Sequence, residues 1–158
     1  MSKLDSMKDQ TFVFGSVLIV ANRMDTLLER ELKEYDVTAK QWFLTVVVDN
    51  FFDKPPKIKE VAREMGSSHQ NVKQVALKLE QKGLLVLETD KKDARVTRLK
   101  LTSQSYKFWK TTQSKAATFT EALFKGIDED EISKARAMLQ KMMVNLSKMD
   151  ENVIGKVV

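Results

Sequence analysis

The stretch IKEVAREMGSSHQNVKQVALKLEQKGLLVLETDKKDARVTRLKLT, residues 58–102, decides the fold of this 158-residue chain. Residues 58–66 have the apolar spacing of a short helix that ends at Gly66. A second helix is predicted after it from an apolar stripe at three- and four-residue steps: Val72, Val75, Ala76 and Leu79. Two helices that meet at a turn of three to four residues form a helix-turn-helix unit, which leaves the outer face of the second helix free for the major groove of DNA.

A β-hairpin is predicted directly after the second helix. Residues 84–89 are rich in apolar residues without a helical period, and residues 90–94 form a polar turn. Residues 96–101 then alternate, with Thr97, Leu99 and Leu101 on one face and Val96, Arg98 and Lys100 on the other. The hairpin is the wing of a winged helix-turn-helix, so the predicted fold class is mainly α with a two-stranded β wing.

Longer helices flank this segment on both sides. The first is predicted from Phe14, Val17, Leu18, Ala21, Met24, Leu28 and Leu32, and the last from Ile132, Ala135, Leu139, Met142 and Leu146. Four residues are predicted to cap helices: Thr38 (with Gln41 in a capping box), Ser67 (with Gln70 in the same spacing), Thr102 and Asp128. Pro55 and Pro56 mark a loop before the helix-turn-helix.

The positive charge of the chain is concentrated in one segment. The formal net charge is +5, but residues 57–110 carry 13 basic and 6 acidic side chains, whereas the rest of the chain is nearly neutral. A polyanion would be attracted to this segment. The alternative is a charged, solvated face without a partner.

Composition excludes several kinds of site. Without cysteine there is no disulfide, thiolate nucleophile or thiol switch, and a single histidine does not make a Cys/His zinc site. No metal and no cofactor are therefore expected. The apolar run from Phe12 to Ala21 is too short for a membrane span and lacks a cleavage signature, so we expect no membrane partner and a cytoplasmic location.

The order of elements and the local residues resemble the MarR family of regulators, named after multiple antibiotic resistance. The resemblance spans nearly the whole chain and is strongest over residues 58–102. It combines Val61-Ala62 in the first helix, the serine-rich turn, residues 79–84 (LEQKGL), Asp93-Ala94-Arg95 in the wing, and the closing Leu101-Thr102.

This resemblance implies a homodimer that binds double-stranded DNA. Residues 36–102 would form the winged DNA-binding lobe of a single 158-residue chain, and residues 1–35 and 103–158 would form the helical dimerisation region. It also implies repression that a small ligand relieves. The chain departs from the family pattern at the start of the recognition helix, where His69, Asn71 and Gln74 stand, and this departure puts any inherited sequence preference in doubt.

The candidate DNA-binding residues lie on the recognition helix and in the wing. On the helix, the side chains off the apolar stripe should face outward: Ser68, His69, Gln70, Asn71, Lys73 and Gln74. Asn and Gln can pair with adenine, and Ser and Lys can reach phosphates, although each singly could equally be a solvated or capping residue. His69 could instead sense pH, on weak grounds.

In the wing, Arg95 is expected in the minor groove, oriented by Asp93, and Lys91, Lys92 and Arg98 are expected to attract phosphates. The alternatives are a surface ion pair and side chains that only keep the hairpin soluble.

Aromatic and methionine side chains are candidates for lining a ligand pocket, and core packing is the main alternative. The candidates are Phe14, Met24, Trp42, Tyr106 and Trp109. An enzyme is not expected, because the chain has no phosphate-cradling glycine loop and no catalytic arrangement beyond Ser67-Ser68-His69. The competing function is a helical interaction module whose basic wing binds an acidic protein.

Overall fold

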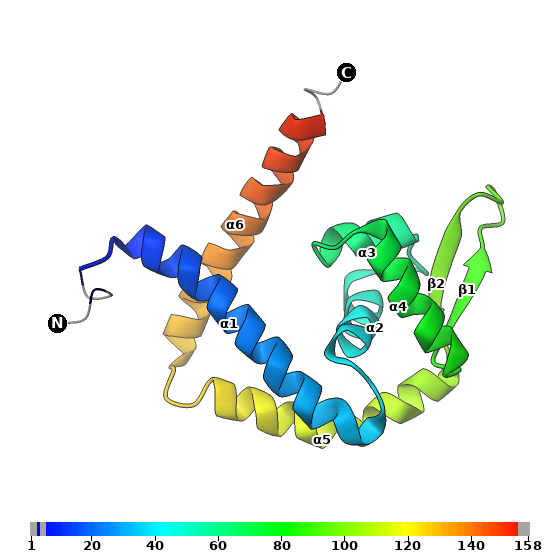
Figure 1. Cartoon of the computed structure of the whole chain (residues 1–158), viewed down its shortest axis with the longest axis horizontal. Coiled ribbons are helices and arrows are strands. Elements are labelled where there is room, and N and C mark those ends of the chain that lie inside the picture. Colours follow the sequence, from blue (N-terminus) through cyan, green and yellow to red (C-terminus); the bar gives the residue numbers. More distant parts are fainter. Residues whose placement is uncertain (1–2, 4–5, 155–158) are drawn as a thin grey trace. The chain divides into compact units, whose positions relative to one another are not determined.

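The computed structural model describes residue 3 and residues 6–154. Six α-helices, one 3-10 helix and a hairpin follow one another in these residues: α1 (Asp9–Leu32), η1 (Lys33–Tyr35), α2 (Ala39–Phe51), α3 (Ile58–Glu64), α4 (His69–Gln81), β1 (Leu85–Thr89), β2 (Thr97–Leu101), α5 (Ser103–Leu123) and α6 (Glu129–Ile154). Figure 1 shows this order in colour along the chain. The chain divides into two compact units, Met1–Gln113 and Ser114–Val158, which are described separately below.

The predicted helix-turn-helix is confirmed as α3 and α4. Gly66 adopts a positive φ of 60° in the turn, a conformation that glycine takes without a steric penalty. The cap of α4 differs from the prediction by one residue, because Ser68 rather than Ser67 accepts a hydrogen bond, 3.1 Å long, from the backbone N–H of Asn71. The capping-box spacing with Gln70 favours Ser67, but a serine at either position can cap a helix, and the path of the turn places Ser68 at the cap.

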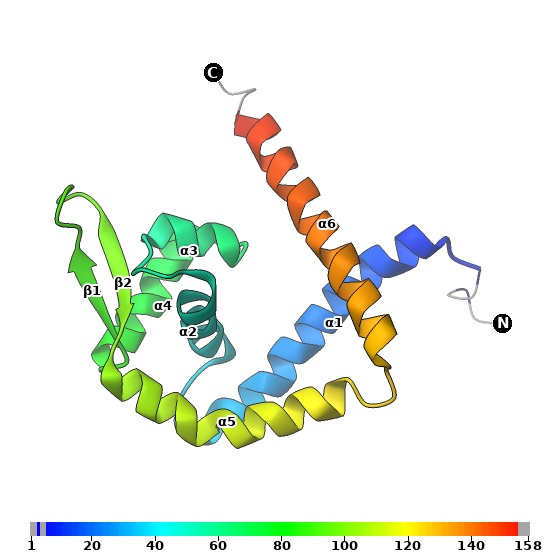
Figure 2. The same ribbon diagram turned by 180° about the vertical axis from the view of Figure 1, so that it is seen from behind.

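The wing is a two-stranded antiparallel hairpin, within one residue of the predicted bounds. Its register pairs Leu85 with Leu101 and Thr89 with Thr97 at the two ends of the ladder. A third segment lies against β2, since the N–H of Leu99 donates to the carbonyl oxygen of Pro56 at 2.8 Å. Figure 2 shows this loop, which leads into α3, passing beside β2. The wing is therefore supported by the loop of the two prolines.

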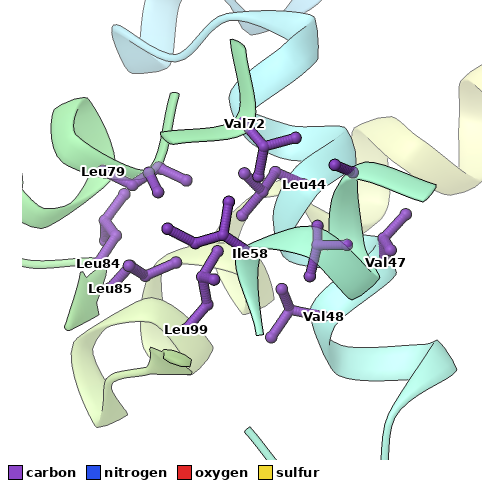
Figure 3. Close-up of a cluster of buried hydrophobic side chains, with 12 residues drawn as sticks. Leu44, Val47, Val48, Ile58, Val72, Leu79, Leu84, Leu85 and Leu99 are labelled. Atoms are coloured by element: carbon purple, nitrogen blue, oxygen red, sulfur yellow. The ribbon is translucent and has the colours of Figure 1, made fainter. Parts of the chain in front are cut away.

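The core of the first unit lies beneath the recognition helix. Val72, Ala76 and Leu79 of α4 are buried there, as the sequence stripe predicts, and Val75 packs against them half-buried. In Figure 3 their partners from α2, α3 and the hairpin surround Ile58, which is only 4% exposed. The remaining buried members of this cluster are Leu44, Val47, Val48, Val61, Ala62, Leu84, Leu85 and Leu99.

Local hydrogen bonds fix the ends of three other helices where the sequence predicts caps. Thr38 and Gln41 form a full capping box at α2. The hydroxyl of Thr102 accepts from the N–H of Ser105 at 3.1 Å and donates to the carbonyl of Gly83 at 2.7 Å, which ties α5 to the end of α4. In the second unit, Asp128 and Glu131 cap α6 reciprocally, which confirms them as helix-terminal charges.

The helices α1 and α6 leave most of their apolar side chains uncovered. Leu32 is the one buried residue of α1, while Phe14 is 66% and Ile19 58% exposed. The segment Asp9–Tyr35 is also long and apolar enough, by length and composition alone, to cross a membrane. The apolar segment is thus longer than the run Phe12–Ala21, and this corrects the expectation that it is too short to span a membrane. One such helix is weak support for a membrane span, since a helix that another protein chain covers has the same composition.

Leu79→Ala should lower the free energy of unfolding by about 2–5 kcal/mol, because it leaves a cavity under the recognition helix. Leu79 is fully buried. Urea unfolding at one fixed protein concentration measures the change, and Gln81→Ala on the exposed side of α4 should stay within about 0.5 kcal/mol of the unaltered protein. Equal stability of the two variants would contradict the assigned orientation of α4.

Candidate nucleic-acid interface

The polar side chains at the start of α4 face away from the core. All six predicted contact residues of this helix are exposed: Ser68, His69, Gln70, Asn71, Lys73 and Gln74. The outward placement follows from the helical period, because Val72, Ala76 and Leu79 occupy the buried side. The first turn of α4, which is completely described, carries no acidic side chain, so the positive end of the helix dipole is not neutralised there. This end of the helix is suited to a negatively charged ligand.

At the tip of the wing, Asp93 holds Arg95 in a bidentate ion pair. The Nε and Nη2 atoms of Arg95 donate to the two carboxylate oxygens of Asp93 at 3.0 and 3.2 Å. The side chain of Arg95 is nevertheless 91% exposed. The hydrogen bond from the Arg95 guanidinium, followed by that from its backbone N–H, lowers the pKa of Asp93. The arrangement agrees with the predicted orienting role of Asp93 and leaves the guanidinium accessible.

Arg98 lies in a different environment from the other wing cations. Its Nη1 donates to the carbonyl oxygen of Pro55 at 2.8 Å, and its Nε pairs with the carboxylate of Asp90. Lys91 and Lys92, by contrast, are exposed at the tip. The three residues predicted to attract phosphates therefore differ. Lys91 and Lys92 lie at the surface, whereas Arg98 is bonded to Asp90 and Pro55.

A cavity of about 360 Å³ lies between the start of α3, the start of α4 and β2. It brings together three predicted residues, His69, Lys73 and Arg95, and adds two that the sequence analysis missed, Lys57 and Lys59. The cavity lining is completed by Ile58, Val96 and Thr97. Its lining contains no acidic residue, so it attracts anions. Lys57 and Lys59 belong to the basic segment that starts at residue 57, and this could have indicated them. Their distance in sequence from the wing gave no indication that they lie near Arg95.

The five residues assigned to a ligand pocket lie in different surroundings. Tyr106 borders a cavity of about 320 Å³ together with Asp49, Phe52, Pro55 and Lys100, among others. Burial, and then a hydrogen bond to Asp49, raises the pKa of Tyr106. Phe14 is exposed, while Met24, Trp42 and Trp109 are half-buried. The indole N–H of Trp109 donates to Ser105 at 3.0 Å, so this side chain contributes to packing.

Within residue 3 and residues 6–154, no three His, Cys, Asp or Glu side chains are grouped so that they could hold a metal ion.

Comparison with known proteins assigns the fold. No protein-family model matches the chain. A helix-turn-helix transcriptional repressor of Pseudomonas putida, IacR, is 20% identical over 142 residues, which cover 90% of this chain and 84% of the relative. The structure of a MarR/EmrR family transcriptional regulator from an Acinetobacter species has a TM-score of 0.77 at 14% identity and covers 90% of this chain and 99% of that one.

The structure of the Staphylococcus aureus protein MepR in complex with DNA is also similar, with a TM-score of 0.73 at 19% identity over 89% of this chain and 99% of that one. These likenesses confirm the fold that the resemblance implies. The chain has the winged helix-turn-helix fold of MarR-family transcriptional regulators.

The carboxylate of Asp90 should titrate far below an ordinary aspartate. The hydrogen bond from Arg98, and then those from the N–H groups of Lys92 and Asp93, lower its pKa from 3.8 to about 2. Because the pKa is lower in the folded wing than in the unfolded chain, this pairing stabilises the wing above about pH 4 and is lost as the pH falls through about 2. Carboxyl ¹³C chemical shifts measured against pH report the value directly.

In Arg98→Gln, the pKa of Asp90 should rise toward about 3.9, the value of an unperturbed aspartate. The pKa of Asp93, which its hydrogen bonds from Arg95 lower, should move less than that of Asp90, since Arg98 is not a direct partner of Asp93. An Asp90 that titrates near pH 4 in the unaltered protein would show that the pair with Arg98 does not form in solution.

Proposed function

We propose that this protein is a homodimeric transcriptional regulator that binds double-stranded DNA in a sequence-specific manner and acts as a repressor. The observation that carries the proposal is the cavity that joins α4 to the wing, because it places His69, Lys73 and Arg95 beside Lys57 and Lys59. A recognition helix and a wing tip on the two sides of one basic cavity suit a duplex, whose phosphates pass between its grooves.

The side chains divide into two roles in this interface. Gln70, Asn71 and Gln74 can read base edges in the major groove, where an amide pairs with adenine through two hydrogen bonds. Arg95 is exposed enough to enter the minor groove, where the negative potential favours a guanidinium. The phosphate contacts then belong to Ser68, His69, Lys73, Lys91, Lys92, Lys57 and Lys59. The hydroxyl of Ser68 accepts the capping bond and keeps its own hydrogen for a phosphate.

A second copy of the chain is the partner proposed for the apolar faces of the terminal helices. Among the residues that the structure describes, twenty large apolar side chains are at least 38% exposed, and sixteen of them lie within residues 7–27 and 123–149. Monomeric proteins rarely leave contiguous apolar surfaces of this kind, and homodimers bury them. Residues 1–35 and 103–158 would thus form the dimerisation region, with residues 36–102 as the DNA-binding lobe.

A small-molecule effector is proposed for the cavity beside Tyr106. Its lining combines the aromatic rings of Phe52 and Tyr106 with the carboxylate of Asp49, so it offers both apolar contact and a charged partner. Pro55 also borders this cavity and accepts a hydrogen bond from the wing, so an occupant would touch the support of the wing.

The other functions considered for the chain receive less support. An acidic protein partner would be attracted by the same basic residues, but it would not require an outward row of amides on α4 beside an exposed Arg95. The proposed function needs no enzymatic activity and places the protein in the cytoplasm, where its DNA target lies.

Substitutions in the recognition helix and in the wing should have different effects on DNA binding. Arg95→Ala should weaken binding to every duplex, because minor-groove contact depends on groove width more than on base identity. Asn71→Ala and Gln74→Ala should instead reduce discrimination by about 1–3 kcal/mol at one base position. Titrations against a genomic fragment selected by binding, its single-base variants and random duplex DNA measure both effects.

All three variants should keep the melting curve of the unaltered protein in circular dichroism, because their side chains are exposed. Unaltered affinity of Arg95→Ala for every duplex would remove the wing from the interface. Unchanged discrimination in both α4 variants would show that the exposed face of α4 does not read bases.

Leu18→Glu should convert the dimer into monomers or aggregates, because it introduces a charge into the apolar face of α1. Leu18 is 55% exposed in the single chain. Light scattering coupled to size-exclusion chromatography gives the mass. Phe51→Glu is the matched control, since Phe51 is 57% exposed but lies at the end of α2, outside the proposed interface. A dimer with Leu18→Glu, or a monomeric unaltered protein, would contradict the proposed role of α1.

A further inference from the structure

A chain of hydrogen bonds runs from the proline loop to the tip of the wing. It begins at the carbonyl oxygen of Pro55, which accepts from Nη1 of Arg98 at 2.8 Å, and Arg98 pairs through Nε with Asp90. Oδ1 of Asp90 accepts the backbone N–H groups of Lys92 at 2.8 Å and Asp93 at 3.1 Å. Asp93 in turn holds Arg95. The exposed guanidinium of Arg95 is thus connected to the proline loop through the guanidinium of Arg98.

The two arginine–aspartate ion pairs of the wing differ in exposure. The side chain of Asp90 is 11% and that of Arg98 34% exposed, whereas the values are 40% for Asp93 and 91% for Arg95. Arg98 also points its donors at two protein acceptors, a carboxylate and a carbonyl oxygen. These hydrogen bonds hold the guanidinium against the protein, so a movement of Arg98 toward the DNA backbone would break charge-assisted hydrogen bonds.

The tip has little else to hold it in place. The ladder of the hairpin ends at the pair Thr89 and Thr97, and residues 90–96 lie beyond it. Two backbone hydrogen bonds remain in this turn, from the N–H of Asp90 to Val96 and from the N–H of Val96 to Asp93. An isolated two-stranded hairpin is marginally stable in water, so its tip depends on such side-chain anchors.

We infer that Arg98 and Asp90 are positioning residues, which fix the tip of the wing on the Pro55 loop so that Arg95 is held ready for the minor groove. The inference rests on the proposed DNA-binding function and replaces the predicted phosphate contact of Arg98. A preorganised tip avoids the entropy loss of ordering flexible side chains when DNA binds, and this raises affinity without any contact between Arg98 and DNA.

The positioning role can be tested by whether removal of a negative charge from the wing weakens or strengthens DNA binding. Asp90→Asn removes a negative charge close to a bound polyanion, so simple electrostatics predicts tighter binding to DNA. Loss of positioning predicts the opposite, a binding constant weakened about three- to tenfold. Glu88→Gln is the matched control, because Glu88 lies in the same hairpin, is 46% exposed and pairs with Lys100 at the surface. It removes the same charge and should leave binding unchanged or slightly tighter.

A double-mutant cycle tests whether Arg98 acts through Arg95. Arg98→Gln should weaken binding about three- to tenfold in the unaltered protein, but less than about twofold in an Arg95→Ala background. Independent contacts with DNA would give the same factor in both backgrounds. Arg98→Lys should weaken binding about as much as Arg98→Gln, because an ammonium cannot donate to Asp90 and Pro55 in the same fork geometry, whereas a direct phosphate contact would survive this exchange.

Each outcome can be assigned to one hypothesis. Circular dichroism melts establish that the variants are folded, and Arg98→Lys, which retains the charge, provides the test if Asp90→Asn does not fold. If the unaltered protein binds no duplex DNA, the proposed function fails. If it binds DNA, and Asp90→Asn binds at least as tightly as Glu88→Gln or the cycle is additive, the positioning role is wrong while the proposed function stands.

Discussion

The burial of one stripe of α4 is the constraint on which the rest of the structure depends. Val72, Ala76 and Leu79 join the core with α2, α3 and the hairpin, so the opposite face of the helix is presented to the solvent. This face can vary in sequence without affecting packing. Because one face of the helix is fixed in the core, the amides and cations on the opposite face are held in a fixed geometry.

The wing needs a separate anchor because it extends beyond this core. Its strands are secured by Leu85 and Leu99, which are buried, and by the hydrogen bond from Leu99 to Pro56. Its tip is connected to the neighbouring Pro55 through Arg98. The proline loop thus supports the middle of β2 directly and the tip through Arg98, and the cavity beside Tyr106 borders the same loop. A ligand in that cavity would act on the wing through few atoms, which is the physical route proposed for regulation.

The terminal helices present the opposite situation, because their apolar faces lack partners among the described residues of their own units. Apolar side chains of α1 and α6 are more than half exposed at Phe14, Ile19 and Met149. The hydrophobic effect favours covering them, and a second copy of the chain offers the same faces. Association and DNA binding would then be linked, since one dimer presents two recognition helices to one duplex.

The sequence alone determined the elements, since helical period, strand alternation and capping residues act within a few positions of one another. The helix-turn-helix, the hairpin bounds and the outward face of α4 were all predictable in this way. Tertiary structure decided which distant groups meet: Arg98 contacts Pro55 across 43 residues, and Lys57 and Lys59 share a cavity with Arg95. It also selected Ser68 over Ser67 as the cap. These outcomes depend on how the loop packs against the hairpin, and no local spacing encodes the direction in which a long, flexible arginine or lysine finds its partner.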